Sequence, residues 1–98
     1  MRLKTKEVIE RAARLIAEEG WIQREYCQYT PTGKAYCIVG AIEAIEFDFD
    51  GNWESVQRAK RKVQNCLDSS LEKWNDAEGR TAEEVYDLLI GATRWEEK

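Results

Sequence analysis

The side chains best suited to chemistry in this sequence lie in the stretch Trp74-Asn75-Asp76, which Arg80 follows closely. An amide, a carboxylate and a guanidinium beside an indole ring suit a planar polar ligand or a protein partner. The same residues also suit a connection between two helices, because the side chains of Asn75 and Asp76 can bond to nearby backbone and stop a helix. The sequence leaves both interpretations open. In the second one, Trp74 is a buried anchor and Arg80 pairs with Asp76.

A second candidate is Cys37, which lies where a strand is expected to become a helix. Unpaired amides at a helix N-terminus lower the pKa of a thiol, which is the environment of a nucleophile. A Cys37-dependent enzyme, oriented by the polar groups of residues 74–76, is therefore one alternative. The sequence contains no histidine, which removes Ser-His-Asp catalysis, Cys-His catalysis and Cys/His zinc sites. The other interpretation of Cys37 is a small buried residue at a tight strand–helix junction.

Residues 46–51, with the sequence EFDFDG, resemble the beginning of a calcium-binding loop. Acidic residues fall at about loop positions 1, 3 and 5, and glycine follows at about position 6. The match then fails, because Trp53 and Gln57 stand where the loop needs a small aliphatic residue and a bidentate glutamate. We expect an acidic turn in which Asp50 or Asn52 caps the next helix, and no metal or other cofactor.

The net charge of the chain is −4, which is opposite to the usual balance of a nucleic-acid-binding protein. The one basic cluster, residues 58–62, lies within a helical pattern and is typical of a solvated helix face. Nucleic acid is therefore not the expected partner. A DNA-contacting protein that acts through residues 58–62 is a further alternative.

Cysteine content and hydropathy bear on the compartment. The chain has three cysteines, an odd number that argues against a disulfide framework, so we expect free thiols. No apolar run approaches the ~18–20 residues that span a bilayer, and no signal-peptide pattern follows the basic N-terminus. These features favour a cytoplasmic protein with no membrane association.

The elements that position the candidate residues begin with a helix and a hairpin. Helical spacing of apolar residues predicts a helix over 5–19, followed by Gly20 in the left-handed conformation. A Thr-Pro-Thr-Gly turn predicts a short β-hairpin within residues 22–36. A three-residue loop with a bulge would place Cys27 opposite Cys37, and a two-residue loop would shift the pairing by one residue.

Three further helices are expected. They run from Ile38 to the acidic turn, from about Trp53 to Leu71 or Trp74, and onward from a capping box that begins at Thr81. We therefore expect one domain, residues 1–98, with a mainly α (α+β) fold of four helices and one short β-hairpin between helices 1 and 2. The residues expected to form its single core are Val8, Ile16, Ile42, Ile45, Val63, Leu67, Leu88 and Leu89.

Four stretches resemble a family of small uncharacterised proteins from actinobacteria and their phages, catalogued only as a domain of unknown function. The stretches are EEGW at 18–21, YCIVGA at 36–41, WNDAEGRT at 74–81 and AEEVYDLL at 82–89. The chain departs from that family's pattern in its lysine-rich composition and its short hairpin. The resemblance carries no activity, but it implies a phage or prophage origin. The residues that match its motif positions are Cys37, Gly40, Trp74, Asn75, Asp76 and Arg80.

These observations favour a small non-enzymatic binding module that binds a host protein or sequesters a small ligand. The resemblance implies a phage-associated protein, for which inhibition of host defence is one form of action. Four Trp and four Tyr residues supply anchors for such binding. A homo-oligomer is also compatible with this function. The residues expected to contact the ligand or partner are Tyr36, Cys37, Trp74, Asn75, Asp76 and Arg80.

Overall fold

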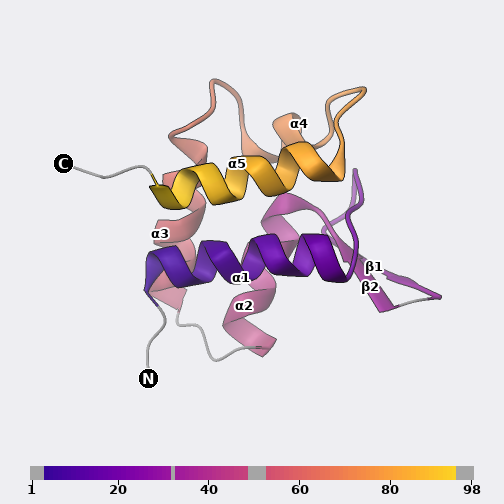
Figure 1. Ribbon diagram of the computed structural model, residues 1–98, viewed down its shortest axis with the longest axis horizontal. Coiled ribbons are helices and arrows are strands. Elements are labelled where there is room, and N and C mark those ends of the chain that lie inside the picture. Colours follow the sequence, from indigo (N-terminus) through magenta and orange to yellow (C-terminus); the bar gives the residue numbers. More distant parts are fainter. Residues whose placement is uncertain (1–3, 32, 49–52, 95–98) are drawn as a thin grey trace.

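The computed structural model describes residues 4–31, 33–48 and 53–94 (Figure 1). Its elements are α1 (Thr5–Glu18), β1 (Cys27–Thr30), β2 (Gly33–Tyr36), α2 (Ile38–Asp48), α3 (Trp53–Gln64), α4 (Leu71–Asn75) and α5 (Ala82–Arg94). The predicted fold class is confirmed: the chain is mainly helical, with an antiparallel two-stranded hairpin between the first helix and the next. The turn at 49–52, where a helix cap was predicted, lies outside the described residues.

The helices form two layers around one core. α1 and α5 lie side by side, and α2 and α3 pass behind them (Figure 1). α1 buries the apolar stripe that its helical spacing predicted. Six of the eight predicted core residues are buried, whereas Leu67 and Leu88 pack against the core only partly buried. No helix in the described residues is long and apolar enough to cross a membrane.

The predicted third helix is two helices, so the described residues contain five. α3 ends at Gln64, and α4 begins at Leu71 after Ser70, whose hydroxyl accepts a hydrogen bond from the Lys73 amide at 3.2 Å. The Gln64 side chain bridges the two, because its Oε1 accepts from the Leu71 amide at 2.9 Å. An Asp-Ser-Ser run precedes α4, and such residues favour caps over helix interiors. The break leaves Leu67 in the connection, which explains its partial exposure.

The hairpin uses the two-residue loop. Thr30 pairs with Gly33, and Cys27 consequently lies opposite Tyr36. The three-residue alternative, with Cys27 opposite Cys37, is wrong, because Gly33 is the first residue of β2 and not a bulge in the loop. All three cysteines are free thiols, as predicted.

Residues 20–22 run along the other side of β2. The Tyr36 amide donates to the Gly20 carbonyl at 3.0 Å, and the Ile22 amide donates to the Tyr36 carbonyl at 3.1 Å. Gly20 adopts φ +134°, which favours glycine, and it faces Ala35 on β2. This segment therefore covers one edge of the sheet and leaves β1 as the outer strand.

Candidate functional site

The Asn75 side chain is the centre of a hydrogen-bond network that joins three segments of the chain. It is completely buried. Its Oδ1 accepts from the indole Nε1 of Trp21 at 2.7 Å and from the amide of Ile38, at the start of α2, at 3.0 Å. Its Nδ2 donates to the Ile22 carbonyl at 3.1 Å and to Asp76 Oδ1 at 3.0 Å. Every donor and acceptor of this amide is thus used inside the protein, as a buried amide requires.

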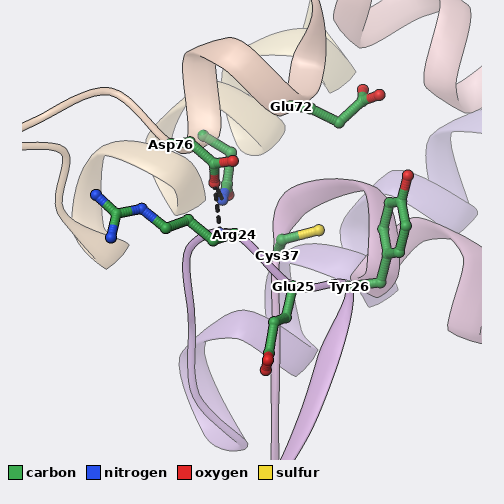
Figure 2. Close-up of a pocket in the computed structure, with 7 residues that line it drawn as sticks. Arg24, Glu25, Tyr26, Cys37, Glu72 and Asp76 are labelled. Atoms are coloured by element: carbon green, nitrogen blue, oxygen red, sulfur yellow. Dashed lines mark hydrogen bonds between the residues drawn. The ribbon is translucent and has the colours of Figure 1, made fainter.

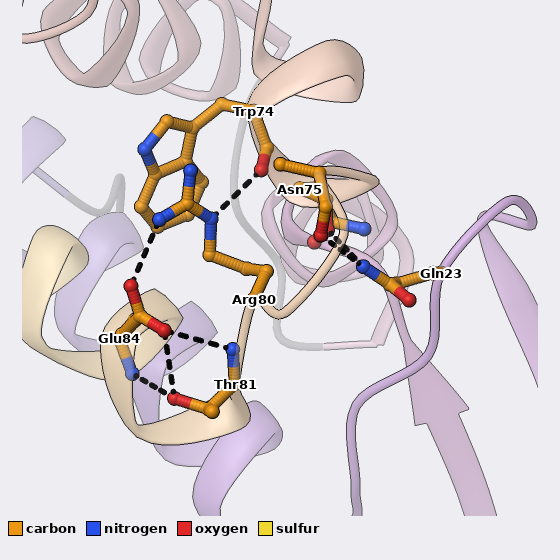
Figure 3. Close-up of polar contacts among 7 residues, drawn as sticks. Gln23, Trp74, Asn75, Arg80, Thr81 and Glu84 are labelled. Carbon is orange, nitrogen blue, oxygen red and sulfur yellow. Dashed lines mark hydrogen bonds and ion pairs between the residues drawn. The ribbon is translucent and has the colours of Figure 1, made fainter.

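The Asp76 carboxylate and the Gln23 amide strengthen the same junction. Asp76 Oδ1 accepts from the backbone amide of Arg24 at 2.8 Å. Arg24 has φ +72°, an uncommon conformation for a residue with a side chain. Gln23 Nε2 donates to the carbonyls of Asn75 and Ala77 at 3.1 and 2.9 Å (Figure 3). Residues 22–24 are therefore held against the end of α4 by side chains from both segments.

Arg80 packs on Trp74 and bonds to α5. Its guanidinium carbon lies 3.9 Å from the Trp74 ring centroid, and its Nε donates to the Trp74 carbonyl at 2.9 Å. Its Nη1 forms an ion pair with Glu84 Oε2 at 2.8 Å (Figure 3). The expectation that Arg80 pairs with Asp76 is therefore wrong, because Asp76 is turned toward the Arg24 amide while Glu84 stands one helical turn away.

The capping box that begins α5 is present as the sequence predicted. The Glu84 amide donates to Thr81 Oγ1 at 3.2 Å, and the Thr81 amide donates to Glu84 Oε1 at 3.2 Å. The hydrogen bond from Arg80, followed by those from Thr81, lowers the pKa of the Glu84 carboxyl. Hydrogen bonds among residues 80–84 thus hold the N-terminus of α5 together.

Cys37 immediately precedes α2 and is buried, with 5% of its surface exposed. Its Sγ accepts from the amide of Gly40 at 3.3 Å, so the thiol caps the helix. Burial raises the pKa of the Cys37 thiol, and the charges of Asp76 and Glu72 raise it further, against the lowering effect of the Gly40 and Val39 amides. The expectation of a lowered pKa is therefore wrong, because desolvation exceeds the effect of the helix N-terminus.

Gly40 is explained by a close approach of the backbone. A Cβ at this position would lie 1.8 Å from the carbonyl oxygen of Tyr26. That same carbonyl accepts a hydrogen bond from the Cys37 amide at 3.1 Å. The Cys-x-x-Gly pattern thus combines a thiol cap with a glycine that lets residue 26 cross the first turn of α2.

A cavity of about 150 Å³ lies where these segments meet. Figure 2 shows Cys37 at its centre, with the Arg24 guanidinium pointing away from the thiol. The residues that line it are Arg24, Glu25, Tyr26, Cys37, Glu72, Asn75 and Asp76. Three carboxylates and one arginine give it a negative balance, which suits a small cationic or polar group.

The structure brings only some of the predicted site residues together. Cys37 and residues 75–76 share the cavity. Trp74 and Arg80 instead contact each other, and Arg80 also pairs with Glu84 on α5. Tyr36 is buried in the hairpin. In the described residues, no group of three or more cysteine or acidic side chains is placed to hold a metal ion.

Two exposed aromatic residues were missed as site candidates. Tyr29 on β1 is 80% exposed, and Tyr26 just before the strand is 56% exposed. Lys34 lies over the Tyr29 ring at 5.3 Å from its centroid. The signal in the sequence was the polar composition of β1, Cys-Gln-Tyr-Thr, which leaves little to bury and so places the tyrosine ring in solvent.

The basic cluster at 58–62 is divided in the structure. Lys60 forms an ion pair with Glu43 at 2.8 Å and is taken up by that contact. A separate hollow of about 280 Å³ is lined by Arg58, Arg61, Lys62 and Thr5 of α1. Three of the four basic residues of the cluster therefore line one hollow, and the fourth is paired with Glu43.

The sequence matches a family of proteins over nearly its whole length. The family is described as "Family of unknown function (DUF6197)", and the match covers residues 1–94. Neither the comparison with curated proteins nor the comparison with solved structures found a match.

Proposed function

The chain belongs to the DUF6197 family, whose function is unknown, and on that premise we propose that it is a small non-enzymatic binding module. The observation that carries the proposal is the pair of exposed aromatic rings at the outer strand of the hairpin, Tyr26 and Tyr29. Tyrosine, which has an apolar ring and a polar hydroxyl, is enriched at protein interfaces and among their anchor residues.

The polar residues that could have made a catalytic centre support the same proposal. The Asn75 amide has all its hydrogen bonds inside the protein, and Arg80 is engaged by Trp74 and Glu84. The Cys37 thiol is buried, and its raised pKa makes the thiolate scarce at neutral pH. A Cys37-dependent enzyme therefore has less support than binding, although the cavity beside the thiol keeps it as the alternative.

The cavity beside Cys37 supports a second form of the proposal, in which the bound molecule is small. A volume of about 150 Å³ holds a group of a few heavy atoms. Such a ligand would enter as a side chain of a partner or as a free small cation.

DNA contact through residues 58–62 is supported only by the hollow lined by Arg58, Arg61 and Lys62. The net charge of −4 opposes it. A steep loss of affinity for duplex DNA with added salt, abolished by Arg61→Ala, is the result that this alternative requires.

The phage or prophage origin implied by the resemblance belongs to the same proposal. In that setting the partner is a host protein, and the consequence of binding is inhibition of a host defence. Expression of the chain in an actinobacterial host should then raise the plating efficiency of a restricted phage. An unchanged plating efficiency over a panel of defence systems would contradict this part.

Affinity capture with tagged protein from a host lysate, analysed by mass spectrometry, tests the binding function. We expect a protein or small molecule that the wild-type chain retains and that the double variant Tyr26→Ser/Tyr29→Ser loses. The matched control is Trp53→Ser, because Trp53 is also exposed, at 62%, but lies on α3. Retention by the double variant, or loss in the Trp53 control alone, would contradict the assignment of this surface.

A further inference from the structure

The outward direction of the β1 backbone follows from the hydrogen bonds of its neighbour. In an antiparallel pair, opposing residues alternate between exchanging both hydrogen bonds and exchanging none. Tyr36 uses its amide and its carbonyl on the far side, toward Gly20 and Ile22. The pair Cys27–Tyr36 therefore exchanges no backbone hydrogen bonds. Two residues further along the strand, the pair Tyr29–Lys34 likewise exchanges none.

The amide and carbonyl groups of Cys27 and Tyr29 consequently point away from β2. Within the described residues the sheet has two strands, and β1 has no neighbour on that side. Such an edge is a template for another strand. It remains accessible, because Cys27 and Tyr29 are both exposed.

The length of β1 decides between a second copy and a short segment as the added strand. Four residues span about 13 Å, and a strip of that length and about 10 Å width covers ~130 Å². A stable dimer buries about 800 Å² per partner. A second copy paired through this edge alone falls far below that value, whereas a flexible segment also reaches the hollows beside the strand.

Two hollows flank the chain at Tyr26. One, of about 310 Å³, lies between the hairpin and α2, and Tyr26, Tyr36 and Ala44 are among its lining residues. The other is the cavity beside Cys37, with its carboxylates. Figure 2 shows Tyr26 at one side of that cavity. An added strand that continues past Cys27 meets both the exposed Tyr26 ring and the negative cavity, and a cation interacts favourably with each.

We propose that the open edge of β1 binds a short, extended, basic segment of a partner protein by strand addition. A lysine or arginine of that segment then lies between the Tyr26 ring and the Glu72 carboxylate, which lie on the same side of the cavity in Figure 2. This inference rests on the proposed binding function and names the chemistry of the partner.

The test uses two labelled peptides, Ser-Lys-Val-Arg-Val-Lys-Ser and its acidic counterpart Ser-Glu-Val-Glu-Val-Glu-Ser, titrated to millimolar concentration into ¹⁵N-labelled full-length protein. We expect the basic peptide to bind at least about tenfold more tightly, because like charges at an interface are strongly disfavoured. It should slow hydrogen exchange at the Cys27 and Tyr29 amides more than at the Gln28 amide, which already faces β2. Equal affinities, or protection confined to Gln28, would overturn the proposal.

Tyr29→Pro removes the outward amide hydrogen and leaves the bonds to β2 intact, since proline is tolerated at such edge positions. We expect Tyr29→Pro to bind the basic peptide at least about tenfold more weakly than Tyr29→Val, which keeps the amide hydrogen. If Tyr29→Pro does not fold, N-methylation of alternate peptide amides makes the same test from the other side. Equal binding in the matched pair would overturn strand addition.

The outcomes also separate this inference from the binding function. Protection of the Cys27 and Tyr29 amides that rises with protein concentration, without peptide, would identify a second copy as the occupant and overturn the proposal. If neither peptide binds while the Tyr26→Ser/Tyr29→Ser variant loses a captured partner, the binding function stands and strand addition fails. If the captured partner is also indifferent to that variant, both fail.

Discussion

Replacing Asn75 by alanine should destabilise the protein strongly, because three groups lose their hydrogen-bond partner. These are the Ile38 amide, the Trp21 indole and the Ile22 carbonyl. An unsatisfied buried group costs about 1–3 kcal/mol. Ile38 is fully buried, so its amide contributes about 2 kcal/mol, whereas the groups of the partly exposed Trp21 and Ile22 recover water and contribute about 1 kcal/mol each. The expected loss is about 4 kcal/mol.

That loss is a large share of the stability of the chain. A domain of this length has a free energy of unfolding of about 5–15 kcal/mol, and about 4 kcal/mol corresponds to a fall in Tm of roughly 15–30 °C. Urea and thermal unfolding followed by circular dichroism measure it. Asn65→Ala is the control, because Asn65 is exposed and its loss should stay within about 0.5 kcal/mol.

A loss below about 1 kcal/mol for Asn75→Ala would contradict this prediction. It would mean that the buried network is not formed in solution. If the same variant also lost a binding partner at equal folded concentration, the stretch around Asn75 would be a ligand site and not a structural junction.

Three more results are expected. Gly40→Ala should cost about 3 kcal/mol or more, or prevent folding, because its Cβ would lie 1.8 Å from the Tyr26 carbonyl oxygen. Gly91→Ala is the matched control: a Cβ there would meet no other described element within 4 Å, so the helix should be stabilised by up to about 1 kcal/mol. Equal effects of the two substitutions on Tm would contradict the close approach at Gly40. Leu67→Ala should cost only about 1–2 kcal/mol, because the side chain is partly exposed, and a loss above about 4 kcal/mol in urea unfolding would place it in the core. At neutral pH, iodoacetamide should label Cys66 well before Cys37, whose burial and raised pKa keep it protonated until the pH is higher; faster labelling of Cys37 would favour the enzyme alternative.

Local patterns were sufficient for most of the fold. The apolar stripe of α1, the turn of the hairpin and the capping box at Thr81 each depend on residues close in sequence, and each was predictable. The break between α3 and α4 was not, because Val63, Leu67 and Leu71 continue the apolar spacing across it. The caps at Gln64 and Ser70 outweigh that spacing, and only the folded chain shows them.

The candidate site was less predictable, because its contacts are distant in sequence. The partners of Asn75 at Trp21 and Ile22 lie more than 50 residues away. The sequence could indicate that Asn75 stops a helix, but not that its side chain is buried against another segment. The predicted direction of the Cys37 pKa shift was wrong for a similar reason. Burial depends on the whole fold, and its effect on the pKa exceeds the local effect of the helix N-terminus.

Photo-cross-linking at the outer strand tests the binding account most directly. A benzophenone amino acid replaces Tyr29 in one variant and Trp53 in another, both at exposed positions. After irradiation in cell lysate, we expect a cross-linked product of defined mass at position 29 and none at position 53. A product at position 53 only, or none at position 29 while a partner is still captured by the intact chain, would contradict the assignment of the hairpin as the binding surface.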